Sequence, residues 1–215
     1  LKDLSEIESV VSEDLAWRYI RMTCDTNNKE LEAAYVSFVN DIQPNIAPYE
    51  DKLNQKIEQS AFKGNLESRE DYFIYFRSIK NAIELFREAN IPIQAELSVM
   101  QQQYGAIAGK MTIEVNGQEY TLQQAAKFLE SADRSLREIV YRKIQDRRLQ
   151  DKEAMHTLYS QLIQKRDELA KNAGFANYRD YKFVELGRFD YTKEDCFQFH
   201  EAVKLHVLPL IEKIY

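Results

Sequence analysis

Apolar residues recur at helical spacing along most of the 215-residue chain. Side chains three and four positions apart share one face of an α-helix, so such stripes predict helices with one buried face. The stripes predict helices over residues 4–20, 31–42, 53–61, 72–86, 93–107, 122–129 and 136–169. We expect Pro44 and Pro48 to end the second helix and Gly64 to end the third, because proline and glycine interrupt helices.

One stretch changes to the two-residue period of a β-strand. Met111, Ile113 and Val115 alternate with polar residues, and a second alternating run follows Asn116-Gly117. Asn-Gly favours a two-residue hairpin turn, because both residues accept the positive φ angles that this turn requires. Residues 111–122 are therefore the one predicted hairpin, and the predicted fold class is mainly α, a multi-helix array with that hairpin.

Several helix boundaries are predicted from capping residues. The pairs 27/30, 121/124 and 192/195 each place a capping side chain three residues before a Glu, Gln or Asp. Asn177 is expected to cap a short helix before Gly187, and Pro209 is expected to bend or restart the last helix. The long stripe over 136–169 is expected to break between Gln150 and Glu153, because few helices reach its length.

No linker divides the chain cleanly. We expect a helical region over residues 1–109, followed over 110–215 by the hairpin and helices that lead into a further domain outside this chain. One continuous helical unit is the alternative. The chain starts at Leu1 and stops in an apolar segment, so we expect a fragment of a longer protein. Six apolar residues within the last eleven are too many for one buried stripe, and several should face that further domain.

Charge, hydropathy and cysteine content narrow the classes of partner and the compartment that we expect for this chain. The net charge of −6 comes from interspersed acidic and basic residues, so no basic surface for nucleic acid is expected. No apolar run approaches a membrane span, which argues against a membrane partner. Cys24 and Cys196 lie far apart without a disulfide pattern, which fits the reducing cytoplasm.

The three histidines raise the question of a zinc site. His200-Glu-Ala-Val-Lys-Leu-His206 resembles the H-E-x-x-H signature, but its histidines are six residues apart rather than four. On an unbroken helix they point about 240° apart, so they do not bind one ion. His156 stands alone on a long helix, and all three histidines are interpreted as surface or hydrogen-bonded residues. No catalytic or metal-binding residue is assigned to this chain, and the substrate-binding residues are left open.

Tyrosine and arginine concentrate between residues 178 and 191. These side chains can line a peptide-binding face, because both are common at interfaces. They can equally join neighbouring helices through hydroxyl and guanidinium contacts, which is the interpretation we favour.

The stretch from about Ile83 to the end carries a family resemblance. The phrases GFANYRDY and LGRFDYTKEDC, and upstream IAGKMTIEVNGQEYTLQQAAKFLESADRSLREIVYRKI, resemble the region before the catalytic domain of oligoendopeptidase F-type enzymes, zinc metallopeptidases of the thimet oligopeptidase family. The N-terminal helices agree with that family only in type.

This resemblance implies a helical peptidase that closes over short peptides, with zinc held by an H-E-x-x-H helix and a later glutamate. Neither the signature nor that glutamate is found here, so the catalytic residues are expected downstream and this chain alone is expected to be inactive and to bind no metal. Its expected role is one wall of the substrate channel of a cytoplasmic enzyme. The alternative is a free-standing helical module that binds peptides or proteins without catalysis.

Overall fold

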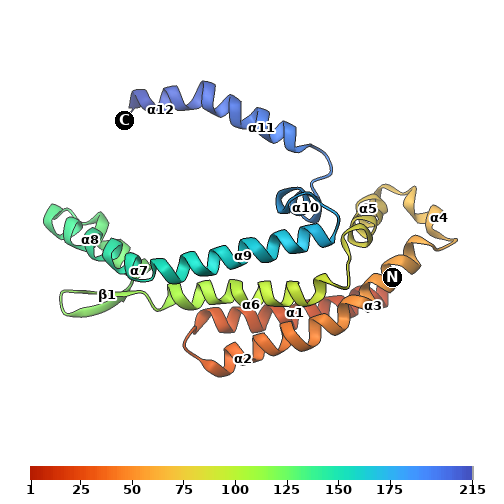
Figure 1. Ribbon diagram of the computed structural model, residues 1–215, viewed down its shortest axis with the longest axis horizontal. Coiled ribbons are helices and arrows are strands. Elements are labelled where there is room, and N and C mark those ends of the chain that lie inside the picture. Colours follow the sequence, from red (N-terminus) through yellow and green to blue (C-terminus); the bar gives the residue numbers. More distant parts are fainter. Residues whose placement is uncertain (215) are drawn as a thin grey trace. The chain divides into compact units, whose positions relative to one another are not determined.

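The computed structural model describes residues 1–214, and helices dominate it (Figure 1). The predicted mainly α fold class is therefore confirmed. The first half contains α1 (Lys2–Cys24), α2 (Lys29–Ser37), the π-helical turn η1 (Phe38–Ile42), α3 (Gln43–Glu58), α4 (Lys63–Glu67), α5 (Glu70–Leu85) and α6 (Asn90–Gly109). After the hairpin come α7 (Leu122–Ala126), the 3₁₀ turn η2 (Lys127–Glu130), α8 (Arg134–Gln150), α9 (Lys152–Asn172), α10 (Tyr178–Glu185), α11 (Lys193–Ala202), the π-helical turn η3 (Val203–Val207) and α12 (Leu208–Ile214).

The hairpin prediction is confirmed in position and in turn chemistry. Strand β1 (Thr112–Val115) pairs antiparallel with β2 (Gln118–Thr121), and Val115 lies opposite Gln118. Asn116 has φ 54° and Gly117 has φ 78°, the two positive angles that the turn requires. The side chain of Thr121 then accepts from the backbone N–H of Gln124, and the Gln124 side chain accepts in return, which fixes the start of α7.

The prediction that Pro44 and Pro48 end a helix is wrong. The chain stays helical from Lys29 to Glu58, because the turn η1 widens just before Pro44 and Gln43 N–H reaches back five residues to the carbonyl of Phe38. The wider turn relieves the clash that a proline ring makes with the carbonyl four residues before it. Asn45 Nδ2 donates to the Asp41 carbonyl at 2.6 Å, so a side chain supplies a donor in this irregular turn.

The C-terminal helix uses the same arrangement. Turn η3 precedes Pro209, and Leu208 N–H bonds to the Val203 carbonyl five residues earlier. The expectation that Pro209 bends or restarts the helix therefore corresponds to a π-helical turn followed by α12. In both places the proline is the second residue after the turn ends, where its missing N–H is tolerated.

Two other helix boundaries differ from the prediction. Helix α2 is capped by Asn28 rather than Asn27, because Asn28 Oδ1 accepts from the backbone N–H of Glu30 and Leu31. Helix α3 ends at Glu58, and Gly64 lies inside α4 instead of ending a helix. The chain turns at Ser60, whose Oγ accepts from the backbone N–H of Phe62 at 3.3 Å. The predicted break near Gln150 is confirmed between α8 and α9.

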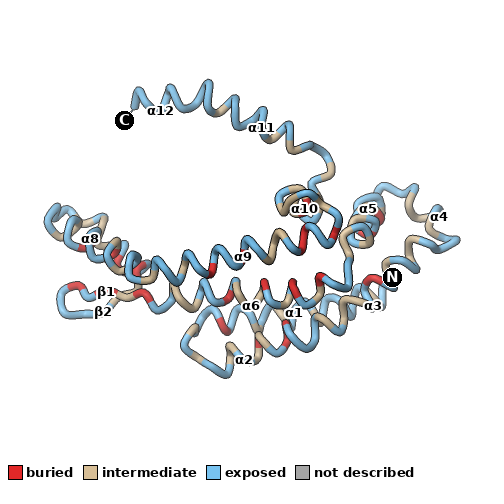
Figure 2. Tube along the Cα trace, in the orientation of Figure 1, coloured by how far each residue is buried: buried red, intermediate tan, exposed pale blue. Residues whose placement is uncertain are grey.

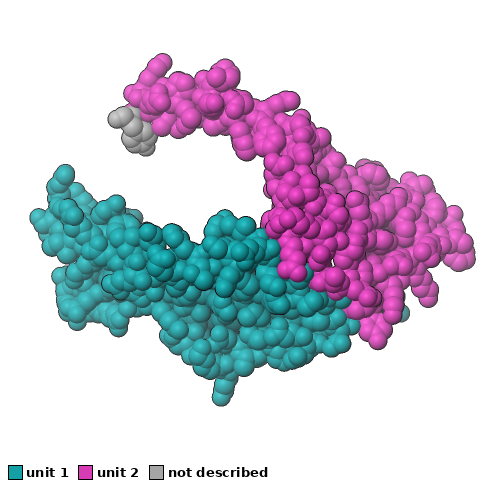
Figure 3. Space-filling view, in the orientation of Figure 1, with its two compact units in different colours: residues 1–47, 91–166 teal, residues 48–90, 167–215 magenta. Residues whose placement is uncertain are grey.

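The chain divides into two compact units, each built from two separate stretches (Figure 3). Unit 1 comprises residues 1–47 and 91–166, and unit 2 comprises 48–90 and 167–215. In unit 1, one core cluster joins Met22 of α1 to Tyr35 of α2 and Val39 of η1, and Ala95 and Val99 of α6 pack against it. A second cluster gathers the hairpin, α7 and α8, and consists of Met111, Ile113, Val115, Leu122, Ala125, Val140 and Ile144.

Unit 2 has a buried polar anchor. Asn90 is 2% exposed, and its Nδ2 donates to the carbonyl of Leu169 at 3.0 Å. Its Oδ1 accepts from Asn172 Nδ2 at 2.9 Å, so both ends of this amide are satisfied. The two stretches of unit 2 are therefore joined by hydrogen bonds between the start of α6 and the end of α9.

The last helical segment buries nothing. From α11 through η3 to α12, every described residue is exposed or half-buried, as the pale blue and tan tube of Figure 2 shows. The six apolar residues that the sequence singled out are 43–76% exposed: Leu205, Val207, Leu208, Leu210, Ile211 and Ile214. The prediction that these residues exceed one buried stripe is confirmed.

Candidate functional site

The three histidines do not form a metal site in the part of the chain that the structure describes. Within residues 1–214, no three His, Cys, Asp or Glu side chains come together in a way that could hold a metal ion. His200 and His206 are exposed and lie on either side of the start of η3, while His156 is an exposed residue of α9. The described residues therefore do not fit the zinc centre that the family resemblance implies.

The tyrosines and arginines of residues 178–191 make contacts inside unit 2. The Arg179 guanidinium lies 5.5 Å from the centre of the Phe197 ring of α11, and the Arg188 guanidinium lies 5.2 Å from that of Phe183. Tyr181 is 2% exposed and packs edge-on against Phe175. These contacts agree with the interpretation that the cluster joins neighbouring helices.

An ion-paired carboxylate links α10 to α11. Asp180 accepts hydrogen bonds from Arg179 Nε at 3.0 Å and from Lys193 Nζ at 3.1 Å, and also from the Asn177 side chain. These donors, Arg179 first, lower the pKa of Asp180 to about 2, because they favour its charged form.

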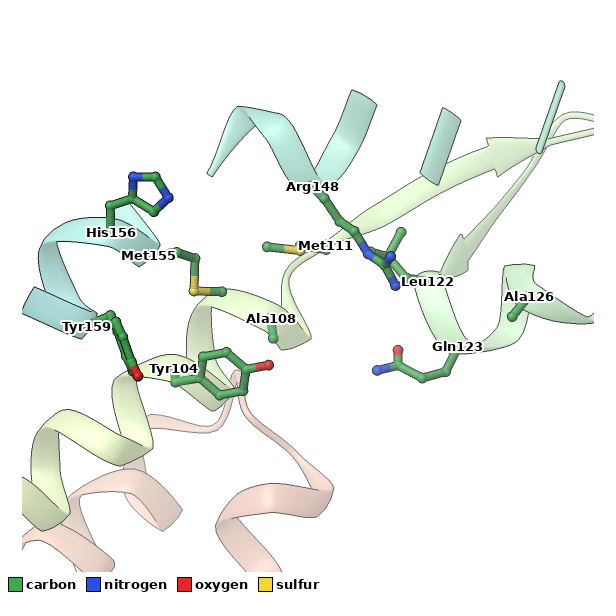
Figure 4. Close-up of a pocket in the computed structure, with 10 residues that line it drawn as sticks. All are labelled: Tyr104, Ala108, Met111, Leu122, Gln123, Ala126, Arg148, Met155, His156 and Tyr159. Atoms are coloured by element: carbon green, nitrogen blue, oxygen red, sulfur yellow. The ribbon is translucent and has the colours of Figure 1, made fainter. Parts of the chain in front are cut away.

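Unit 1 contains a pocket of about 630 Å³, a volume within the usual range of small-molecule and peptide side-chain sites (Figure 4). Five elements or their flanks contribute to it: α6, the residue before β1, α7, α8 and α9. Its lining consists of Tyr104, Ala108, Met111, Leu122, Gln123, Ala126, Arg148, Met155, His156 and Tyr159.

The floor of this pocket, called the Tyr104 pocket below, belongs to the core. Met111 is 6% exposed and Leu122 is 9% exposed, and both are members of the cluster beneath the hairpin. Met155 packs against the same cluster from α9. The floor is therefore fixed by packing, whereas its thioethers are flexible and adapt to apolar groups of different shape.

The rim of the pocket consists of aromatic and polar side chains. Tyr104 and Tyr159 are 59% and 61% exposed, and in Figure 4 they stand on the opposite side of the pocket from Arg148 and Gln123. The side chains of Arg148 and Gln123 make no hydrogen bond or ion pair with any residue between 1 and 214. His156 lies next to Met155 at the edge of the pocket in the same view.

Two adjacent arginines at the rim, Arg147 and Arg148, differ in their contacts. Arg147 pairs with Asp151 at the break between α8 and α9, and its Nη2 also donates to the Lys110 carbonyl at 3.3 Å. Arg147 therefore holds the end of α8 in place. Arg148, the next residue, projects over the pocket and forms no ion pair within residues 1–214.

A second cavity of about 310 Å³ adjoins the first. It shares Tyr104, Met155 and Tyr159 with the Tyr104 pocket and continues between α6 and α9 over Leu158 and Leu162. Together the two cavities form one groove, called the α6–α9 groove. At one end only helices α6 and α9 line it, and at the other end it meets α7.

Sequence reasoning did not find this site. Tyr104 lies within the helix predicted over residues 93–107, but among the apolar residues of that stretch only Ile93 and Leu97 are buried, and Tyr104 is exposed. The sequence does contain one signal for this site. Arg147 and Arg148 are adjacent, but only one acidic residue, Asp151, follows one helical turn later, so it can pair with only one of the two arginines.

Two family models match the chain. The peptidase M3 N-terminal domain matches residues 1–86, and peptidase family M3 matches residues 127–215. The chain belongs to peptidase family M3. Of the Tyr104 pocket, Arg148, Met155, His156 and Tyr159 lie in the second matched stretch of this M3 chain, and residues 104–126 lie between the two.

Solved structures agree with this family in fold. A protein described as an oligoendopeptidase F has a TM-score of 0.84 at 23% identity, over 91% of the M3 chain and 34% of its own chain. An oligoendopeptidase F described from Bacillus anthracis has a TM-score of 0.84 at 21% identity, over 91% of the M3 chain and 36% of its own chain. PZ peptidase A with an inhibitor has a TM-score of 0.85 at 24% identity, over 92% of the M3 chain and 35% of its own chain. The M3 chain thus spans about a third of these proteins.

None of the curated proteins matches the M3 chain. None of its helices between residues 1 and 214 combines the length and apolar character that crossing a bilayer requires.

Proposed function

We propose that the chain is the helical, peptide-contacting part of a cytoplasmic zinc metallo-oligopeptidase that hydrolyses short peptides. The observation that carries this proposal is the match of both residues 1–86 and residues 127–215 to M3 peptidase models. In this proposal the zinc and the catalytic residues belong to another part of a longer polypeptide, because the described residues do not fit a zinc centre. The free thiols of Cys24 and Cys196 support a reducing compartment.

The proposed role of unit 1 is one wall of the substrate channel. Its α6–α9 groove offers an apolar floor with exposed tyrosines, which suits the side chains of varied peptides. A wall of this kind restricts the enzyme to substrates thin enough to lie in the groove, and folded proteins are excluded.

The exposed segment α11–η3–α12 supports a further domain. Its apolar side chains have no cover within the described chain, and a contiguous apolar surface is typical of an interface. In this proposal the catalytic part of the polypeptide covers them.

The proposal is tested by comparing this 215-residue chain with a polypeptide that continues downstream through an H-E-x-x-H signature. Each purified protein is assayed for zinc by elemental analysis and for cleavage of an internally quenched peptide of about eight residues. We expect one zinc and cleavage in the longer polypeptide, and neither in the 215-residue chain. Folded proteins should stay intact in both assays.

Two results would contradict it. Stoichiometric zinc in the 215-residue chain that is lost on His200→Ala would place a metal site in this segment. A longer polypeptide that binds peptides but never cleaves them would favour the free-standing binding module.

A further inference from the structure

At the end of the α6–α9 groove against α7 stands an arginine, Arg148, that pairs with no residue between 1 and 214. Along α6 and α9 the groove is lined by tyrosine, methionine and leucine, with Gln101 and Arg166 in the lining as well. Arg166 has an interaction partner within the described chain. Where it meets α7, the unpaired guanidinium of Arg148 and the unpaired carboxamide of Gln123 stand over the apolar floor of Met111 and Leu122 (Figure 4). The groove thus ends at hydrogen-bond donors that no described residue of the chain uses.

The groove has room for a short extended segment. Its residues on α9 run from Met155 to Arg166, which is about 16 Å at the helical rise of about 1.5 Å per residue. An extended peptide advances about 3.3 Å per residue, so about five residues fit along this length.

We infer that the Tyr104 pocket binds the C-terminal end of a peptide, with the terminal carboxylate on Arg148 and Gln123 and the last apolar side chain on Met111 and Met155. Arginine suits this role because its planar guanidinium donates two parallel hydrogen bonds to a carboxylate. The amide of Gln123 adds a donor from α7. This inference rests on the proposed function, because it takes the occupant of the groove to be a peptide.

A chain end fits this site better than an acidic side chain inside a longer peptide. Helix α7 contributes Leu122, Gln123 and Ala126 to the lining only at this end, so α7 meets the path that α6 and α9 define. A peptide that lies along the groove therefore reaches α7 with its end. The charge also agrees, since in a protein of net charge −6 the cation of Arg148 has no acidic partner among residues 1–214.

The test measures binding of three N-acetylated probes to the 215-residue chain by isothermal titration calorimetry. The probes are Ac-Ala-Ala-Phe-Leu with a free C-terminal carboxylate, the same peptide as its C-terminal amide, and Ac-Ala-Ala-Phe-Glu amide, which carries its carboxylate on a side chain. We expect the free acid to bind at least about 10-fold more tightly than either amide, as a charge-assisted bidentate pair provides.

Variants assign the effect to its residues. Arg148→Gln should weaken the free acid about 10-fold and leave the amide unchanged, so that the acid-to-amide ratio approaches one. Arg142→Gln is the matched control, because Arg142 lies on the same helix, carries the same charge and pairs with Glu138 outside the pocket. Ala108→Phe should weaken acid and amide alike by filling the groove. Circular dichroism melts establish that each variant is folded.

The outcomes separate this inference from the proposed function. Equal binding of acid and amide, equal binding of the Glu-amide probe, or an unchanged ratio in Arg148→Gln would each overturn the inference. Binding of no probe at millimolar concentration would overturn it as well. None of these results bears on zinc content or peptide cleavage by the longer polypeptide, which test the proposed function independently.

Discussion

Replacing Gly117 by valine tests how strongly the hairpin turn supports unit 1. Gly117 has φ 78°, and an added Cβ would meet no atom within 4 Å. A steric clash is therefore excluded as the cause of any loss, and only the backbone conformation is at stake. The left-handed region costs an ordinary L-residue about 1–2 kcal/mol, and a β-branched residue lies at the upper end.

This conformational cost should lower the stability of unit 1 as a whole, because the turn holds β1 in register with β2. Ile113 and Val115 point from β1 into the cluster beneath the hairpin and are 7% and 3% exposed. We expect Gly117→Val to lower the free energy of unfolding by about 2 kcal/mol. For a chain of this length that corresponds to a fall in melting temperature of roughly 4–8 °C.

The assay is thermal and urea unfolding followed by circular dichroism, with Gly105→Ala as the matched control. Gly105 lies in α6, where an added Cβ also meets no atom within 4 Å, and its φ is not positive. Alanine there should stabilise the protein by about 0.5–1 kcal/mol. If Gly117→Val melts with the parent, the hairpin does not support unit 1 and the reasoning fails.

Three further results are expected. The pKa of Asp180 is lowered to about 2 in the folded protein, so its ionised form stabilises the fold above about pH 4 and this stabilisation is lost as the pH falls toward 2. The difference in urea midpoint between the parent and Asp180→Asn should therefore be larger at pH 6 than at pH 2.5. Val140→Ala, at a fully buried position, should cost about 2 kcal/mol, whereas Ile139→Ala, at a half-exposed one, should cost less than half as much in the same urea assay. Asn90→Leu should lower the free energy of unfolding by about 1–3 kcal/mol, because it leaves the carbonyl of Leu169 without its donor. Asn90→Ser should restore none of this loss if the shorter serine side chain does not reach that carbonyl.

Local chemistry explains which parts of the fold were predictable. The capping pairs at Thr121 and Thr192 involve residues three positions apart, so their hydrogen bonds are encoded within one turn of chain. The hairpin turn depends on two adjacent residues, Asn116 and Gly117. Such features do not require knowledge of what the rest of the chain does, and the structure has each of them where the sequence placed it.

Features that depend on neighbouring turns or distant segments were not predictable in this way. The effect of Pro44 was misjudged because the widened turn η1 that accommodates it has no sequence pattern of its own. The Tyr104 pocket was missed because Tyr104, Gln123 and Arg148 come together only when three helices pack.

The interleaved assembly of the two units constrains the order of events during synthesis on the ribosome. The cluster of Met22, Tyr35 and Val39 is completed by Ala95 and Val99, about 60 residues later in the chain. At about 5–20 residues per second, the first helices emerge roughly 3–12 s before their covering helix exists. Throughout that interval the nascent chain presents an aromatic and aliphatic surface to water, which makes α1 and α2 the segment where a chaperone that acts during translation would bind first.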